Sequence, residues 1–242
     1  MGAKNETLKL TTLFSVVLGK IMIALGLTPS LGLPKETQQS LFFYGSLVQI
    51  NGDALDAEFL RGDSPDKIGT QLQAFGYVLV IYAFIVLQDQ YKRLKVFQVN
   101  NFMQVLAGVI ILSDRNVWKK NYLAIGNIII ILGNFIMALG RNDRLRSIAP
   151  LAYIDPLETR GGWTQATGAA IIFLGEVEKS MRNKKVEKGV QKNLNLENDK
   201  EGNKLKRTSV IPDKSCSVVK EEALFHHTLK DLMKKSPLLL YN

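Results

Sequence analysis

Residues 122–140 read YLAIGNIIIILGNFIMALG and contain no charged side chain. Their number matches the roughly 20 residues that an α-helix needs to cross a bilayer core of about 30 Å. Gly126 and Gly133 lie on one side of such a helix, and Asn127 and Asn134 lie beside them. The opposite side is formed by large apolar residues. A small, amide-bearing side on an otherwise apolar helix is typical of membrane helices that pack against other helices.

Three other stretches have a similar length and hydropathy, namely residues 10–27, 70–87 and 96–113. A cleaved signal peptide is the alternative for residues 10–27, but Lys20 interrupts the apolar run and no small-x-small cleavage motif follows it. The sequence therefore predicts an all-α integral membrane protein built as a four-helix bundle. The residues expected at helix contacts or in a polar interior are Gly19, Gly76, Asn101, Gln104, Gly108, Gly126, Asn127, Gly133 and Asn134.

Basic residues gather in the last quarter of the chain. Residues 179–242 hold 15 Lys and Arg against 8 Asp and Glu, so +7 of the total charge of +9 lies there. We expect this segment to be a disordered, basic cytosolic tail, with either an amphipathic helix or a frayed helix over residues 221–235. Residues 1–147 form the predicted membrane domain. Residues 148–178 form a predicted juxtamembrane segment with a short interfacial or half-buried helix.

Residues 32–69 are the longest predicted loop and carry a net negative charge. Within this loop the run Ser40–Ile50 is apolar, but it is too short to cross a bilayer and suits an interfacial helix or a lid. The spacing of Asp53, Asp56 and Glu58 does not match a Ca²⁺-binding loop. We therefore expect a solvated acidic face here.

The distribution of Lys and Arg predicts the orientation, because cytosolic loops are enriched in these residues. With the N-terminus in the cytosol, the basic segments 89–95 and 141–146 and the tail also lie there, and the acidic loop lies outside. Only the loop over residues 114–121 disagrees with this arrangement. We expect a multi-pass protein of the endoplasmic reticulum or another internal membrane, with both termini cytosolic.

Lys20 is the most unusual residue, because a Lys near the middle of a span costs about 2.5–3.5 kcal/mol on insertion scales. No Asp or Glu lies within the four predicted spans, so the bundle offers no buried counter-charge. Three interpretations remain open. Lys20 snorkels to an interface, or it contacts a carboxylate on a partner subunit, or it lines a polar cavity. The cavity would be shared with Asn101, Gln104, Asn127 and Asn134.

The sequence contains no nucleophile elbow, P-loop, zincin helix or dinucleotide-binding loop. We therefore expect no enzymatic activity and no cofactor. His226 and His227 are adjacent in the tail without cysteine partners close by, which is weak support for a metal site. Because no buried Asp, Glu or His is expected in the spans, a proton-driven transporter is disfavoured. A folded basic surface for nucleic acid is also missing.

We expect a non-enzymatic accessory, scaffold or assembly subunit of a membrane complex. The packing sides of the helices, the unpaired Lys20 and the long tail favour a protein partner within the membrane, in addition to lipids. The alternative is a carrier for a small molecule or lipid, or a channel subunit, that uses the amide-lined interior.

Overall fold

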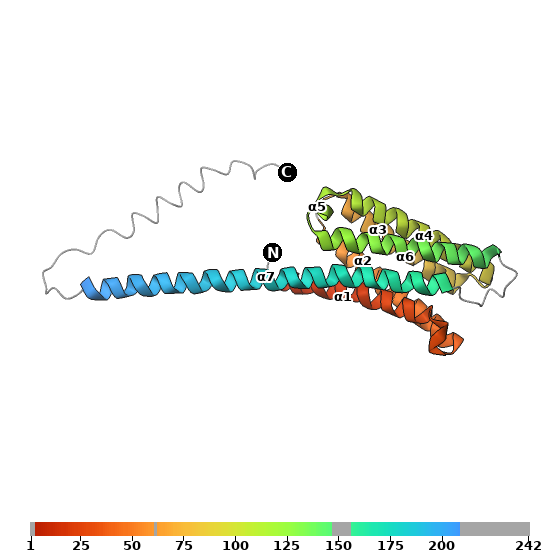
Figure 1. Ribbon diagram of the computed structural model, residues 1–242, viewed down its shortest axis with the longest axis horizontal. Helices are drawn as coiled ribbons and strands as arrows, with labels where there is room; N and C mark the ends of the chain where they lie inside the picture. Colours follow the sequence, from red (N-terminus) through yellow and green to blue (C-terminus); the bar gives the residue numbers. More distant parts are fainter. Residues whose placement is uncertain (1–2, 61, 147–155, 209–242) are drawn as a thin grey trace, which may run out of the picture. The chain divides into compact units, whose positions relative to one another are not determined.

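The computed structural model describes residues 3–60, 62–146 and 156–208, and it is helical almost throughout (Figure 1). Residues up to Val186 form one compact unit, and Glu187 begins a second unit, whose described part is helical to Thr208. The predicted helix at 221–235 and both histidines lie outside the described residues. The helices are α1 (Ala3–Gly26), the 3-10 helix η1 (Pro29–Leu31), α2 (Lys35–Phe59), α3 (Pro65–Val86), α4 (Gln90–Ser113), α5 (Arg115–Trp118), α6 (Asn121–Arg146) and α7 (Pro156–Thr208).

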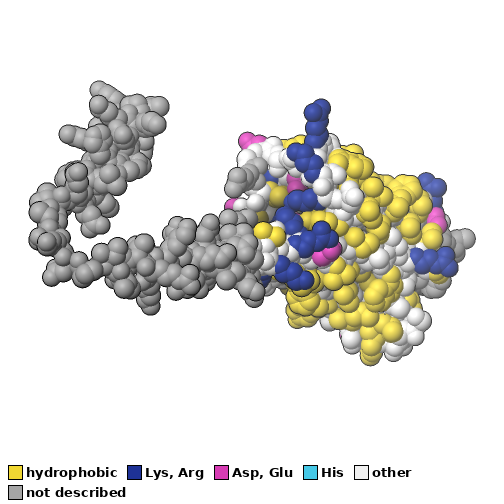
Figure 2. Space-filling model, turned by 60° about the vertical axis from the view of Figure 1, so that its left-hand side comes forward, with side chains coloured by type: hydrophobic (Ala, Val, Ile, Leu, Met, Phe, Trp, Pro, Cys, Tyr) yellow, Lys and Arg dark blue, Asp and Glu magenta, His cyan; other side chains and the backbone are white. Residues whose placement is uncertain are grey.

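The all-helical membrane fold expected from the sequence is confirmed. Within the described residues, four helices are long and apolar enough to cross a membrane, and they coincide with the four predicted stretches. These segments are Glu6–Gly26, Pro65–Val86, Gln90–Ser113 and Asn121–Arg146. Figure 2 shows a broad hydrophobic surface between two groups of Lys and Arg side chains, as a bilayer-embedded protein requires. Large exposed residues on the four helices include Phe14, Phe75, Ile85, Phe102, Leu106, Ile125, Leu132 and Phe135.

Helix α2 corrects the expectation of a long loop with a short interfacial helix or lid. It has 25 residues, and its middle packs into the bundle, with Phe42, Ser46 and Gln49 buried. Gly19 of α1 and Gly45 of α2 allow the two backbones to meet, since a Cβ on Gly19 would lie 2.8 Å from the Gly45 carbonyl oxygen. The flanking charges hid this helix in the sequence, because hydropathy over a window is lowered by every charge at its edges.

Helix α7 also differs from its prediction. We expected a short, half-buried or interfacial helix around residue 163 and a disordered tail from residue 179, whereas one helix of 53 residues extends to Thr208. Its first part packs against α6 through paired glycines. A Cβ on Gly133 would lie 2.7 Å from the carbonyl oxygen of Gly161, and one on Gly126 would lie 2.8 Å from that of Gly168. The glycine side of the central stretch therefore meets a helix of the same chain.

The long helices of the compact unit alternate in direction. Lys9 of α1 forms an ion pair with Glu176 of α7 at one end, and the carbonyl oxygen of Leu27, directly after α1, accepts a hydrogen bond from Thr159 of α7 at the other. We call the end with Lys9 and Glu176 the near end, and the end with Leu27 the far end. Phe42 at the start of α2 lies 5.7 Å, between ring centroids, from Phe84 at the end of α3.

This arrangement corrects the predicted grouping of the basic segments. Because α2 returns along the full bundle, α3 begins at the same end as α1, and the connection between α3 and α4 lies at the far end. Arg144 at the end of α6 forms an ion pair with Glu158, so this segment lies at the far end as well. Segments 89–95 and 141–146 therefore lie at the end opposite Lys9, not beside it.

Candidate functional site

Lys20 lies inside the bundle and is only 4% exposed. Its Nζ donates a hydrogen bond to the hydroxyl oxygen of Tyr77 at 3.4 Å and lies 5.7 Å from the centre of that ring. Asp53 of α2 lines the same cavity as Lys20 and is 4% exposed. The buried counter-charge that the four apolar spans lack is thus supplied by α2, and the snorkelling interpretation of Lys20 does not fit this burial.

A cavity of about 90 Å³ leads from the near end to Lys20, enough for several water molecules. Its wall has charges of both signs on four different helices, α1, α2, α3 and α7, and on the segment before α6. The Oδ2 atom of Asp53 is buried and has no hydrogen-bond partner among the described residues. Because buried polar atoms are almost always hydrogen-bonded, this oxygen is available to accept a hydrogen bond from a polar ligand. The charged and amide residues that line the cavity are Lys9, Lys20, Asp53, Asp56, Asp66, Gln73, Lys120, Asn127 and Glu176.

Glu176 joins several elements at the near end of this cavity. Its carboxylate lies 3.3 Å from Lys9 and 3.6 Å from Lys120, and its Oε1 accepts a hydrogen bond from the Tyr122 hydroxyl at 2.9 Å. Partial burial lowers the pKa of the Lys120 ammonium, although the neighbouring Glu176 carboxylate opposes the shift. These contacts hold α1, α6 and α7 together at the mouth of the cavity.

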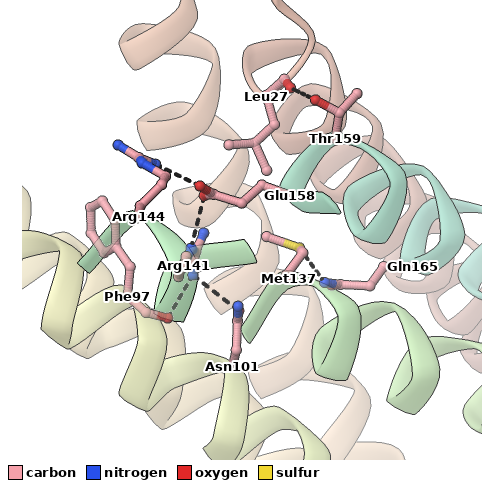
Figure 3. Close-up of polar contacts among 9 residues, drawn as sticks. All are labelled: Leu27, Phe97, Asn101, Met137, Arg141, Arg144, Glu158, Thr159 and Gln165. Atoms are coloured by element: carbon pink, nitrogen blue, oxygen red, sulfur yellow. Dashed lines mark hydrogen bonds and ion pairs between the residues drawn. The ribbon is translucent and has the colours of Figure 1, made fainter. Parts of the chain in front are cut away.

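A second buried charge cluster lies at the far end, between α4, α6 and α7 (Figure 3). Arg141 is 1% exposed, and its Nε donates to Glu158 Oε2 at 3.2 Å. Its Nη1 donates to the Asn101 Oδ1 at 3.0 Å and to the carbonyl oxygen of Phe97. Arg144 Nη1 donates to Glu158 Oε1 at 2.7 Å, so one carboxylate binds two guanidinium groups. Both oxygens of Glu158 and three acceptors around Arg141 are thus bonded, as a buried ion pair needs, while the buried Nδ2 of Asn101 has no hydrogen-bond partner among the described residues.

The far end also contains a cavity of about 150 Å³ beside this cluster. Its charged lining consists of Lys35, Arg93, Arg141 and Arg144 against the single carboxylate Glu158. An apolar layer with Ile23, Tyr77, Val80 and Met137 at its centre lies in the core of the bundle. Within the described residues, a cavity with charged lining residues is thus reached from each end of the bundle.

The predicted amide residues fall into different places. Asn127 lines the near-end cavity with Lys20, as the cavity interpretation requires. Gln104 donates from Nε2 to the Gln73 carbonyl oxygen at 2.8 Å, Asn101 binds Arg141, and Asn134 donates to the carbonyl oxygen of Ile130 in its own helix. Among these four amides, Asn127 is therefore the one that shares a cavity with Lys20.

The predicted small residues are all helix contacts. Gly19, Gly126 and Gly133 face the backbones of neighbouring helices. Gly76 leaves room for the side chains of Asn100 and Gln104, and Gly108 for that of Ile131.

Several residues of these clusters escaped the prediction, among them Asp53, Arg141, Arg144, Glu158 and Glu176. Asp53 and Glu158 were assigned to a loop and to a juxtamembrane segment, where carboxylates are ordinarily solvated. A signal was present in α2, because residues 37–52 contain no charge and continue directly into Asp53. Among the described residues, no group of His, Cys, Asp and Glu has the arrangement of a metal site.

Residues 7–173 match the model of a family of unknown function, DUF6944. The chain therefore belongs to this family, whose match covers α1 to α6 and the bundled start of α7. No curated protein and no solved structure matches the chain significantly.

Proposed function

We propose that this member of the family is a membrane carrier, or a subunit of a channel, that binds a small polar solute inside its helix bundle. The observation that carries the proposal is the near-end cavity with Lys20 and Asp53 at its inner end. Both charged groups are buried, and Asp53 retains an unused acceptor atom among the described residues. Burying unsatisfied charge is costly, so such groups within a membrane bundle generally serve a ligand or an ion.

The arrangement of the two cavities supports transport rather than simple storage. One cavity opens toward the near end and the other toward the far end, with the Tyr77 layer between them. A carrier needs a binding site near the middle of the membrane that becomes reachable from each side in turn. The Tyr77 hydroxyl lies where this layer meets the near-end cavity and accepts a hydrogen bond from Lys20. A bound solute can replace this hydrogen bond.

The buried carboxylates also remove the argument against coupling to protons. That argument assumed that no Asp or Glu lies inside the bundle, whereas Asp53, Glu158 and Glu176 are all buried. Both charge signs line the near-end cavity, which favours zwitterionic and neutral polar solutes over strongly charged ones. No chemical step is required of these residues, so the proposed role is binding and passage rather than catalysis.

The test uses the full chain, purified in a mild detergent and reconstituted in liposomes. The probes are alanine as a zwitterion, glycerol as a neutral solute and sodium ions, each with and without a pH gradient. We expect at least one probe to stabilise the protein thermally or to enter the liposomes, and Asp53→Asn or Lys20→Met to abolish that effect. Lys119→Gln is the control, because Lys119 is exposed and lies outside the cavity. The proposal is wrong if no probe stabilises the protein and no probe enters the liposomes.

An accessory role in a membrane complex is a second proposal, supported by α7. This helix continues to Thr208, well beyond the residues that match the family, and so offers a segment for a protein partner. Crosslinking in native membranes followed by mass spectrometry would identify that partner. If truncation after Val186 leaves all crosslinks unchanged, this role is excluded for the segment.

The location in the cell remains a prediction from the sequence. The ion pair between Lys9 and Glu176 places the start of α1 and the part of α7 around Glu176 at one end of the bundle. The cytosolic side and the endoplasmic reticulum, or another internal membrane, are the proposed assignments. Protease protection of tagged termini and membrane fractionation test them.

A further inference from the structure

We infer that the far-end cavity binds a phosphate group attached to an apolar tail, namely the headgroup of an anionic phospholipid. The site is separate from the proposed solute site, because neither Lys20 nor Asp53 lines it. The inference goes beyond the proposed function and does not depend on it.

The charge of the cavity favours an anion. Four basic side chains line it and only one carboxylate does. That carboxylate, Glu158, is already bound by Arg141 and Arg144. Within the described part of the chain, Lys35 and Arg93 form no ion pair, and the Nε of Arg93 is buried without a hydrogen-bond partner. Arg93 therefore has a donor directed at no protein acceptor, next to a second unpaired cation.

Arg93 is also held in position for such a role. Its Nη2 donates to the carbonyl oxygen of Leu87 at 2.7 Å, and its guanidinium lies 5.5 Å from the centre of the Phe84 ring. A guanidinium fixed at one nitrogen and on one face keeps its remaining N–H groups in a defined plane. That plane suits the paired oxygens of a phosphate, which arginine binds through two parallel hydrogen bonds.

The apolar part of the ligand has a matching wall. Phe42, Phe84 and Phe97 form an aromatic cluster with ring centroids 5.1–5.7 Å apart, and all three line the cavity. Leu27 and Leu94 complete this side. Cations on one side and phenyl rings on the other fit an amphiphile better than a fully hydrated inorganic ion.

The position of the cavity points to a membrane lipid. Its lining includes Gly26, Gln90 and Arg144, which lie at or close to the ends of the apolar helices α1, α4 and α6. Lipid headgroups lie at this depth, where the hydrocarbon core ends. The volume of about 150 Å³ accepts a phosphate and the first carbons of a lipid, while the acyl chains remain in the bilayer.

The experiment measures lipid binding to the purified full-length protein in a non-ionic detergent. The probes are phosphatidylglycerol, phosphatidylcholine and inorganic phosphate. Native mass spectrometry measures their binding, and thermal unfolding measures the change in stability. We expect phosphatidylglycerol to bind and to raise the unfolding temperature, with phosphatidylcholine and inorganic phosphate having little effect. Arg93→Gln should weaken phosphatidylglycerol binding about tenfold, the effect of losing one charge-assisted contact.

Lys92→Gln is the matched control, because Lys92 is exposed on the same turn of α4 and does not line the cavity. If Arg93→Gln fails to fold, Lys35→Gln at the exposed rim replaces it, with the same expectation. Equal binding of phosphatidylglycerol and phosphatidylcholine would overturn the inference, and so would binding that neither variant weakens. Stabilisation by inorganic phosphate equal to that by phosphatidylglycerol would overturn the lipid assignment and leave a soluble phosphate compound as the ligand.

Discussion

The two buried charge clusters of the bundle differ in how completely their groups are bonded. At the far end, Arg141 donates to Glu158, Asn101 and the Phe97 carbonyl oxygen, and it lies 5.6 Å and 5.4 Å from the rings of Phe42 and Phe97. In the middle of the bundle, Lys20 donates one hydrogen bond among the described residues, to the Tyr77 hydroxyl at 3.4 Å. Asp53 keeps a buried oxygen without a partner among the described residues.

This difference separates a structural role from a binding role. A buried ion pair contributes to a fold only if its geometry is good and its remaining donors and acceptors are satisfied. The Arg141–Glu158 cluster comes close to that condition, because Arg141 has three acceptors and both oxygens of Glu158 are bound, and it joins α4, α6 and α7. The Lys20–Asp53 site does not meet it and lies beside a cavity. We therefore expect substitutions within the Arg141–Glu158 cluster to change stability and substitutions of Lys20 or Asp53 to change solute binding.

The largest effect is expected for Glu158→Gln. Removing this charge leaves two guanidinium groups without their shared carboxylate, and breaking a buried pair costs about 3–5 kcal/mol. Thermal unfolding in detergent should show a large fall in stability. The control is Glu178→Gln, whose ion pair with Arg182 is exposed and contributes about 0.5 kcal/mol or less. Equal effects of the two substitutions would show that the far-end cluster is not structural.

Asn101→Ala should have the next largest effect. The substitution takes one acceptor from Arg141 but leaves Glu158 in place, and a hydrogen bond to a charged group contributes about 1.5–3 kcal/mol. Val99→Ala is the control, because Val99 is exposed on the same helix. If Asn101→Ala unfolds at the same temperature as this control, the amide is not part of the structural network.

Tyr77→Phe should destabilise the protein by about 0.6 kcal/mol, the average for a hydrogen bond between membrane helices. The ring and its packing remain, so a small effect isolates the bond to Lys20. Chemical unfolding of wild type and variant side by side gives the difference. A loss as large as that of Glu158→Gln would contradict the view that the middle site is weakly bonded.

The double substitution of Lys20→Met with Asp53→Asn should change stability least, by about zero to 1 kcal/mol in either direction. Both buried charges disappear together, so neither is left alone, and replacing opposite buried charges by uncharged residues is often neutral or stabilising. Unfolding experiments on the double variant and on each single variant form a complete cycle. If the double variant is strongly destabilised, Lys20 and Asp53 have a structural role like that of the Arg141–Glu158 cluster.

The sequence by itself determined that this protein has the pattern of a membrane protein, and it located the four apolar helices. The uncharged run around Gly126 and Gly133 and three similar stretches predicted four apolar helices, and the structure has them at those positions. The spacing of the glycines predicted which side of α6 packs. These features are local, because length, hydropathy and periodicity are properties of a single helix.

Only the tertiary structure decided which residues face one another. It showed that α2 returns through the bundle and brings Asp53 beside Lys20, and that α7 covers the glycine side of α6. It also joined Arg141 to Glu158 across a connection between two helices. A charged residue next to an apolar stretch lowers the hydropathy of that stretch equally, whether its side chain is solvated or buried against another helix. The burial of Asp53 and Glu158 depends on contacts with distant helices, which no local pattern contains.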